Sequence, residues 1–230
     1  METYSQFQED LIIWSFFKKK TDGVFLEIGA NEPKTLSQTY LLEKNGWNGV
    51  LIEPMPGLAT KLRKERSAQV FEVAVSSSDN EGKAYLVLDG AESFIQPEKP
   101  KGNHTEITVT TIDKVLEKAR IKEIDFLSID IEGEELPALQ NFNIKKYKPK
   151  LILIEDHCEN LKKHRYLQAQ DYHLVNRIGC NNWYVPKGDR VSFTKQVSRY
   201  QLIRKLYLGM PTRKARLFLR KFKFSRHYRD

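Results

Sequence analysis

Four apolar runs of strand length each end in or beside an acidic residue, at Glu27, Glu53, Asp130 and Glu155. If the runs are neighbouring parallel strands, these carboxylates line one rim of the sheet. Like charges at one rim repel, so the cluster predicts either shifted pKa values or a bound cation. Oxygen ligands from Asp130, Glu155 and Asp156 would suit a hard divalent ion such as Mg2+.

His157 directly follows the last of these acids. An imidazole beside a carboxylate is a candidate general base, because it titrates near neutral pH. A lone histidine is as often structural, and the sequence leaves both interpretations open. His157 is therefore the predicted general base.

The first run leads into a turn that could cradle a ligand. Residues 24–28 are followed by Gly29, Asn31 and an amphipathic segment over 35–44, which predicts a strand, a tight turn and a helix. Glycine lets the backbone approach a ligand, and a helix N-terminus offers unpaired N–H groups. Glu53 lies about 20 residues beyond the turn, where such folds hold ribose hydroxyls.

Two ligand classes compete for this turn. A dinucleotide site carries three glycines against the pyrophosphate, whereas only Gly29 is present here. Glu27 and Glu32 would repel a pyrophosphate, but they suit a cationic or zwitterionic ligand such as S-adenosylmethionine. The remaining alternative is a parallel sheet whose strand ends are acidic without a ligand.

The elements that must position these residues alternate between strands and helices. This alternation is typical of βαβ units and predicts an α/β fold with a mostly parallel sheet. A third strand is expected over 70–75. Two short strands are expected further on, separated by a loop that could lie over the ligand pocket. The predicted helices cover 36–44, 58–64 and 112–119, the short strands 85–88 and 107–109, and a terminal β-hairpin 172–175 and 182–185.

The N-terminal segment predicts a helix of its own within residues 1–22. Ser5 and Gln8 match a capping box, and Phe7, Leu11 and Trp14 follow at helical spacing. Such a helix either covers the sheet or closes over the ligand.

Length and composition fit one large α/β domain with appendages, since the chain has 230 residues. Cys158 and Cys180 are the only cysteines and have no zinc-like spacing, which favours a reducing compartment. Residues 1–10 are polar and acidic, unlike a signal peptide, and no apolar run reaches the roughly 20 residues of a membrane span. We expect a cytoplasmic protein.

The positive charge is concentrated at the C-terminal end. The net charge is +8, but from Lys195 onward twelve basic residues face one acid, so the tail carries +11 and residues 1–194 carry −3. Long apolar residues alternate with these bases, which suits an interfacial helix on anionic lipid at the inner face of a membrane. The alternatives are a solvated extension and a phosphate clamp for nucleic acid.

Several motifs together resemble the FkbM family of S-adenosylmethionine-dependent methyltransferases. The resemblance covers most of residues 5–186. Its motifs are EIGANEP at 27–33, LLEKNGWNGVLIEP at 41–54, TTIDKVL at 110–116, DFLSIDIEGEE at 125–135 and ILIEDH at 152–157. It implies a Rossmann-like methyltransferase domain over 23–190, with a seven-stranded sheet ending in the hairpin, between the N-terminal helix and a basic amphipathic tail over 191–230.

The resemblance also implies which residues hold the cofactor. Glu27, Gly29 and Asn31 would meet its methionine part, and Glu53 its ribose. Asp130 and Glu132 would face the reaction centre. Residues in or beside the matched motifs complete the predicted cofactor site: Ala30, Ser37, Pro54, and Ala74 and Val75 near the adenine.

The reaction implied is O-methylation of a hydroxyl, commonly on a sugar or a polyketide-like product, and we expect a sugar in a bacterial glycan or glycolipid. The placement of Asp130, Glu155 and Asp156 is similar to the magnesium site of catechol-type O-methyltransferases, which makes Mg2+ a second candidate cofactor. A nucleic-acid methyltransferase using the basic tail is the alternative, against which the acidic rim counts. A non-catalytic module that only binds S-adenosylmethionine is the third, against which the retained acids and His157 count.

Overall fold

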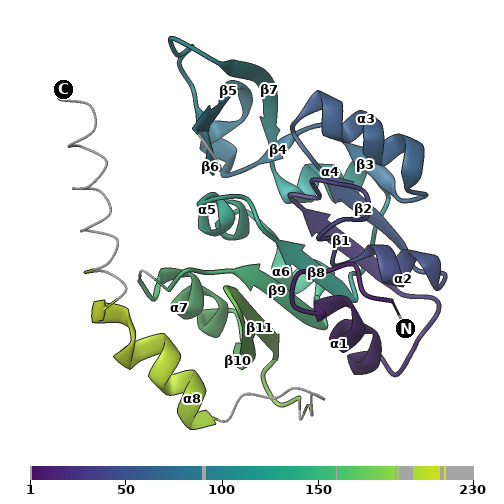
Figure 1. Cartoon of the computed structure of the whole chain (residues 1–230), viewed down its shortest axis with the longest axis vertical. Helices are drawn as coiled ribbons and strands as arrows, with labels where there is room; N and C mark the ends of the chain where they lie inside the picture. Colours follow the sequence, from purple (N-terminus) through teal and green to yellow (C-terminus); the bar gives the residue numbers. More distant parts are fainter. Residues whose placement is uncertain are drawn as a thin grey trace.

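A seven-stranded sheet, sheet A, forms the centre of the computed structural model, which describes residues 2–89, 92–158, 160–189, 191, 199–212 and 215 (Figure 1). The strand order is β10-β11-β9-β8-β1-β2-β3. Strands β9, β8, β1, β2 and β3 pair in parallel, and β11 pairs antiparallel with both β9 and β10. The predicted mostly parallel, seven-stranded sheet with a terminal antiparallel hairpin is therefore confirmed. The strands are β1 (Val24–Ile28), β2 (Asn48–Ile52), β3 (Gln69–Phe71), β8 (Phe126–Ile129), β9 (Leu151–Glu155), β10 (Tyr172–Ile178) and β11 (Asn181–Pro186).

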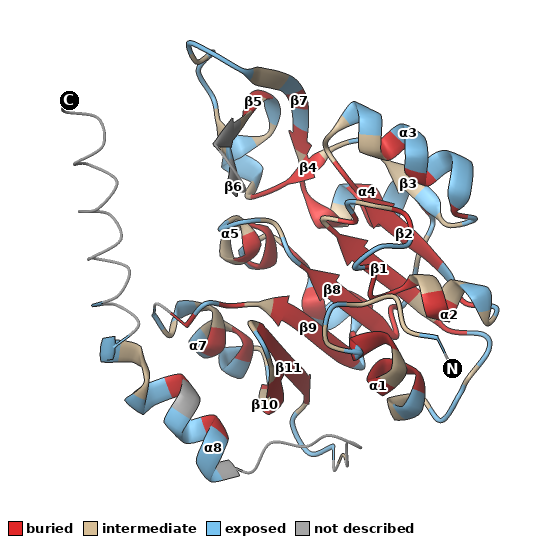
Figure 2. Ribbon diagram, viewed as in Figure 1, coloured by how far each residue is buried: buried red, intermediate tan, exposed pale blue. Residues whose placement is uncertain are grey.

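The central strands are apolar because helices cover both faces of the sheet, as Figure 2 shows by their burial. Successive side chains of β1 enter opposite cores: Phe25 packs with α1, α2 and α3, and Leu26 packs with α4 to α7. Parallel pairing brings the carboxyl ends of β1, β2, β8 and β9 to one edge. The helices are α1 (Glu9–Phe16), α2 (Tyr40–Lys44), α3 (Pro56–Glu65), α4 (Ile112–Lys118), α5 (Glu135–Gln140), α6 (Ile144–Tyr147) and α7 (Lys162–Ala169), with a short 3-10 turn, η1 (Ser78–Asn80).

The N-terminal helix α1 begins at Glu9, and the predicted capping box does not form. The Asp10 carboxylate instead gathers the segment before the helix, accepting hydrogen bonds from the Thr3 hydroxyl at 2.6 Å, the Tyr4 amide at 2.7 Å and the Ser5 hydroxyl at 2.8 Å. Ile12, Ile13 and Trp14 are buried against the sheet, although the helix starts later than expected.

A second, four-stranded sheet was not predicted. Sheet B has the order β4-β7-β5-β6 and lies at the top of the view in Figure 1, above α5. The strand predicted over 70–75 was wrong as one element: it divides at Glu72 and Val73 into β3 of sheet A and β4 of sheet B. Part of the predicted loop is the strand β6. A small core of Ala84, Leu86, Ile107 and Val109 holds this sheet together, whose strands are β4 (Ala74–Val75), β5 (Gly82–Asp89), β6 (Glu92–Gln96) and β7 (His104–Thr110).

The described part of the tail is helical. It comprises α8 (Arg199–Ile203) and a π-helical segment, η2 (Arg204–Leu208). Leu202 and Leu206 are buried, and the Tyr207 hydroxyl lies 3.4 Å from Nε2 of His164 on α7. Most of the predicted tail, including its second amphipathic stretch, lies outside the described residues. Within the described ranges, no helix has the length and apolar character that a membrane span requires.

Candidate active site

A cavity of about 410 Å³ opens at the carboxyl ends of β1, β2, β8 and β9. Sheet B closes it from one side through Leu86, Phe94 and Ile95. Gln6 and Glu9 close it from another, so the N-terminal segment both packs on the sheet and walls the cavity. A cavity of this size at this edge of an α/β sheet is where such folds bind their ligands.

Gly29 permits the close packing of strand ends at the floor of the cavity. Its φ is +80°, and a Cβ built on it would lie 1.9 Å from the carbonyl oxygen of Asp130. The amides of Gly29 and Ala30 both donate to the carbonyl of Ile52, at 3.0 and 3.1 Å. Any side chain at position 29 would force β1 and β8 apart, so glycine is required at this turn.

Glu53 links the loops that follow β1 and β2. Its carboxylate accepts from the amide of Asn31 at 2.9 Å through Oε2 and from the amide of Met55 at 2.9 Å through Oε1. Burial raises the pKa of Glu53, and the two amide donors partly oppose that rise. Each oxygen keeps a lone pair that can accept from a ligand hydroxyl, which suits the predicted ribose contact.

Glu27 lines the cavity, but its carboxylate is already occupied. It accepts from the amide of Gln38 at 3.1 Å and from the hydroxyls of Thr39 at 2.5 Å and Ser37 at 3.4 Å, and Arg66 lies 3.9 Å away. Burial raises the pKa of Glu27, and the Arg66 charge works against that rise. Glu27 and Ser37 thus position the segment after β1, and Ser37 does not line the cavity.

The two acids that the sequence suggested would repel a pyrophosphate are both compensated by cations. Glu32 pairs with Lys61 at 2.7 Å and Glu27 faces Arg66, so neither is the free charge that the sequence suggested. Among the described lining residues there is nevertheless no Lys, Arg or His. The acids of the lining are Glu9, Glu27, Glu53, Asp130, Glu132, Glu134 and Glu155. A cation is therefore favoured and a phosphate disfavoured.

The opposite end of the cavity is apolar. It is lined by Met55 and Leu58 after β2, by Val73 between the sheets, and by Ala74, Val75, Leu86, Phe94 and Ile95 of sheet B. An acidic end, a hydroxyl acceptor at Glu53 and an apolar end match the cationic sulfonium, ribose and adenine of S-adenosylmethionine.

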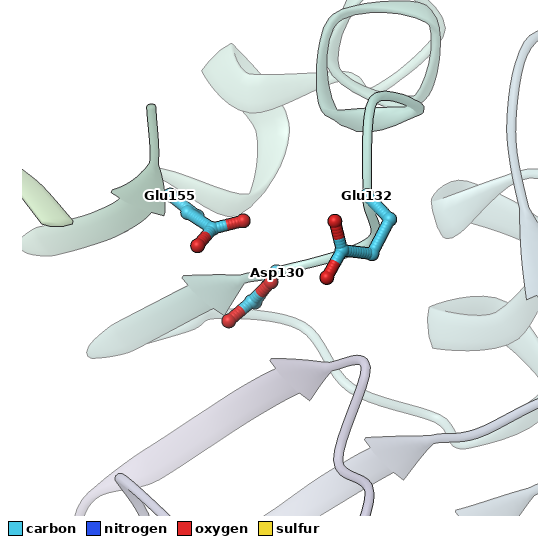
Figure 3. A group of neighbouring side chains, drawn as sticks. All are labelled: Asp130, Glu132 and Glu155. Atoms are coloured by element: carbon cyan, nitrogen blue, oxygen red, sulfur yellow. The ribbon is translucent and has the colours of Figure 1, made fainter. Parts of the chain in front are cut away.

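Three carboxylates meet where β8 and β9 end. Figure 3 shows Asp130, Glu132 and Glu155 pointing toward one another, and each offers an oxygen within 4.8 Å of the others. Glu132 reaches the group because its φ is +48° and Gly133 follows at +105°, which turns the chain back after β8. Loss of hydration raises the pKa of Asp130 to about 8, and the neighbouring Glu155 charge adds to the rise.

Asp156, one of the three predicted metal ligands, is not part of this group. Its buried carboxylate accepts from Nδ2 of Asn182 at 3.0 Å and from the amide of Cys158 at 2.8 Å, and Lys163 lies 3.6 Å away. Glu132 takes the place predicted for Asp156 beside Asp130 and Glu155.

His157 lies on the other side of the carboxylates. Its Nε2 is 3.6 Å from Oε1 of Glu155, and its side chain is 62% exposed. It lines a second cavity of about 460 Å³ and not the first. The two cavities share Glu132 and Glu155, so the carboxylate group separates a cofactor-sized space from a second ligand space.

The structure brings to the first cavity all the predicted cofactor residues except Ser37. Sequence reasoning missed several of its neighbours. Phe94 and Ile95 fell in the segment expected to lie over the pocket, which was their only signal. Gln38 and Met55 adjoin predicted residues, whereas Glu9 and the hairpin residues Cys180 and Asn181 gave no local signal.

Two adjoining cavities thus lie at the carboxyl edge of an α/β sheet, which is where such folds bind their ligands. A sequence model of the methyltransferase FkbM domain matches residues 27–174. The chain belongs to the FkbM methyltransferase family.

Solved structures with a similar fold include two bound to S-adenosylhomocysteine. One is TrmK from M. capricolum, with 10% identity, a TM-score of 0.46, and coverage of 86% of this chain and 74% of that chain. Another is an O-methyltransferase from Bacillus cereus, with 11% identity, a TM-score of 0.43, and coverage of 79% and 81%. No curated protein sequence matches the chain.

Proposed function

We propose that the protein transfers a methyl group from S-adenosylmethionine to a hydroxyl of a sugar, in a glycan or glycolipid. The observation that carries this proposal is the position of Glu132 and Glu155 at the boundary of the two cavities, with Asp130 beside them in the first cavity. Carboxylates at that boundary can accept a hydrogen bond from an acceptor hydroxyl and hold its oxygen toward the methyl group. The family assignment supplies the group that is transferred.

The cofactor would lie along the first cavity. Glu53 would accept from the ribose hydroxyls, and the apolar side chains of Val75, Leu86 and Phe94 would enclose the adenine. The acidic end would attract the sulfonium and amino groups. Gly29 and Asn31 would bring the backbone of the turn against the methionine part, as the sequence resemblance implied.

The acceptor would occupy the second cavity. Its described lining contains carboxylates, an amide and two lysines, and no Phe, Tyr or Trp. Such a lining suits a molecule with many hydroxyls better than a flat aromatic phenol. The crowded acids Glu132, Glu135, Glu155 and Asp156 in its lining disfavour a nucleic-acid backbone.

The reaction requires one proton to leave. S-adenosylmethionine, held by Glu53 and the turn at Gly29, would supply the methyl group and leave as neutral S-adenosylhomocysteine, with the electron pair of the broken sulfur–methyl bond on sulfur. The hydroxyl proton would pass to the carboxylates, and His157, whose Nε2 lies 3.6 Å from Glu155, would receive it and release it to solvent. When no metal ion is bound, Asp130 would position Glu155 by sharing a proton with it, since the pKa of Asp130 is raised to about 8.

Mg2+ is the second cofactor in this proposal. Asp130, Glu132 and Glu155 would hold it, because their oxygens lie within 4.8 Å of one another and hard cations prefer carboxylates. When bound, the ion would lower the pKa of the acceptor hydroxyl.

Radiolabelled methyl transfer tests the proposal. The full chain is incubated with S-adenosylmethionine carrying a labelled methyl group and with panels of oligosaccharides, lipid-linked glycans and RNA, with Mg2+ or a chelator. We expect label in the glycan fractions and loss of transfer in Glu132→Gln. Label in RNA alone, or none in any fraction although the cofactor binds, would contradict the proposed acceptor.

A further inference from the structure

The C-terminal helix formed by α8 and η2 presents an apolar surface to solvent. Of the six large apolar side chains exposed in the described part of the chain, four lie on this helix: Tyr200 at 69%, Ile203 at 46%, Tyr207 at 43% and Leu208 at 64%. The other two, Leu36 and Phe94, line the cofactor cavity. We call these four residues the helix patch.

The helix is fixed to the protein by two buried leucines and by the hydroxyl of one patch residue, Tyr207. Leu202 and Leu206 are 9% and 2% exposed, and the Tyr207 hydroxyl reaches His164 on α7. Figure 1 shows the helix running alongside α7. Leu202 and Leu206 supply the apolar packing that holds the helix on the protein. The exposed side chains of the helix patch are not needed for that packing.

Basic residues are dense in the sequence segment that contains the helix patch. Arg204 is exposed between Ile203 and Leu208. The segment from Lys195 to the end carries twelve basic residues and one acid in the sequence, whereas residues 1–194 sum to −3. Exposed apolar side chains among dense cations are the combination that inserts into an anionic lipid interface.

We propose that the C-terminal helix docks the protein on the surface of an anionic phospholipid bilayer through the helix patch. An anionic bilayer is complementary to both features of this segment. Its acyl region can take up the apolar side chains, and its lipid phosphates can pair with the basic residues of the segment. The phosphates of a nucleic acid would pair with the basic side chains, but Ile203 and Leu208 would stay exposed to water.

The docked surface would lie beside the second cavity. In the first turn of helix α7, Lys162 and Lys163 line that cavity. His164, the next residue of the helix, contacts Tyr207. A bilayer held by the helix patch would therefore be near the proposed acceptor opening. Lipid binding itself does not depend on the methyl-transfer proposal.

Vesicle co-sedimentation of the full chain tests this inference. We compare vesicles of phosphatidylcholine alone with vesicles of phosphatidylcholine and phosphatidylglycerol. The protein is expected to sediment with the anionic vesicles only, and added salt is expected to weaken binding. The variant Ile203→Glu/Leu208→Glu should lower binding about tenfold or more, and Arg204→Glu about fivefold or more.

Lys64→Glu provides a matched charge reversal. Lys64 is exposed on α3, which packs on β3 at the sheet edge opposite β10. Its vesicle binding should stay within about twofold of the parent chain. Thermal unfolding and S-adenosylmethionine binding report whether each variant is folded, and both should match the parent because all substituted side chains are exposed.

Three outcomes would overturn the inference. The first is no sedimentation with anionic vesicles at physiological salt. The second is undiminished binding by a folded Ile203→Glu/Leu208→Glu variant. The third is that the protein binds duplex DNA or RNA through its basic residues but does not bind vesicles.

Discussion

Arg66 is predicted to hold the wall of the cofactor cavity through a buried ionic network. Its guanidinium donates to Glu43 at 2.9 Å, to the carbonyl of Pro33 at 3.0 Å and to the hydroxyls of Ser37 at 3.3 Å and Thr39 at 2.8 Å. No part of its side chain is exposed. The loop it ties down carries Thr35, Leu36 and Gln38 into the cavity lining.

The substitution Arg66→Met keeps the aliphatic bulk and removes the charge and the donors. Glu27 and Glu43, whose side chains are 6% and 8% exposed, would then be buried without their cation. Breaking one partner of a buried ion pair costs about 3–5 kcal/mol, so we expect a loss of that size in the free energy of unfolding. Arg63→Met, in the last turn of α3, is the matched control, since the pair of Arg63 with Glu72 is exposed and should contribute about 1 kcal/mol or less.

The deficit of Arg66→Met should depend on pH with a defined sign. The pKa of Glu27 is already raised in the folded protein, and loss of Arg66 would raise it further. A carboxyl whose folded pKa exceeds its unfolded value loses stability as pH rises between the two values. The deficit should therefore shrink when urea unfolding, followed by tryptophan fluorescence, is repeated at about pH 5 instead of about pH 7.5. A deficit no larger than that of Arg63→Met, or one that is equal at both pH values, would refute the reasoning.

Three further predictions concern the site. Gly29→Ala should cost on the order of 1–3 kcal/mol in thermal stability and weaken cofactor binding, because its Cβ meets the Asp130 carbonyl; an unchanged melting temperature with unchanged affinity would contradict this. Cofactor affinity should fall as the pH is lowered, and the midpoint of this fall should lie above the pKa of an exposed glutamate. The reason is that the pKa of Glu53 is raised and its ionised form is the better hydrogen-bond acceptor. Glu53→Gln should remove this pH dependence of the affinity in calorimetric titrations. An unchanged pH dependence in the variant would show that a group other than Glu53 causes it. His157→Ala should lower kcat about 100-fold with the KM for the cofactor unchanged, because His157 lines only the second cavity; an unchanged kcat would remove it as the proton acceptor.

The sheet was predictable because its strands are buried on both faces. β1, β2, β8 and β9 read as continuous apolar runs, and parallel pairing then places Glu53, Asp130 and Glu155 at one edge without further information. The end of the first strand also located the turn at Gly29 and Asn31, but the helix predicted over 36–44 was wrong in its first part, because α2 begins only at Tyr40. These features depend on local patterns that a single chain displays.

The parts that escaped prediction depend on distant partners or on single dihedral angles. Arg66 is far in sequence from Glu27, so nothing near Glu27 revealed that its charge was compensated. Glu132 replaces Asp156 among the carboxylates because of a positive φ at Glu132, which residue type alone does not encode. The division of residues 70–75 between two sheets rests on a two-residue strand, β4, too short to leave a periodic signal.

Calorimetric titration of the full chain with S-adenosylmethionine tests the central claim most directly. The account predicts saturable binding, weakened about tenfold or more by Glu53→Ala but not by Glu123→Ala, an exposed glutamate outside the cavity. It also predicts no binding of NAD, whose pyrophosphate the acidic lining would repel. Absence of S-adenosylmethionine binding, or equal affinity in the two glutamate variants, would contradict the assignment of this cavity as the cofactor site.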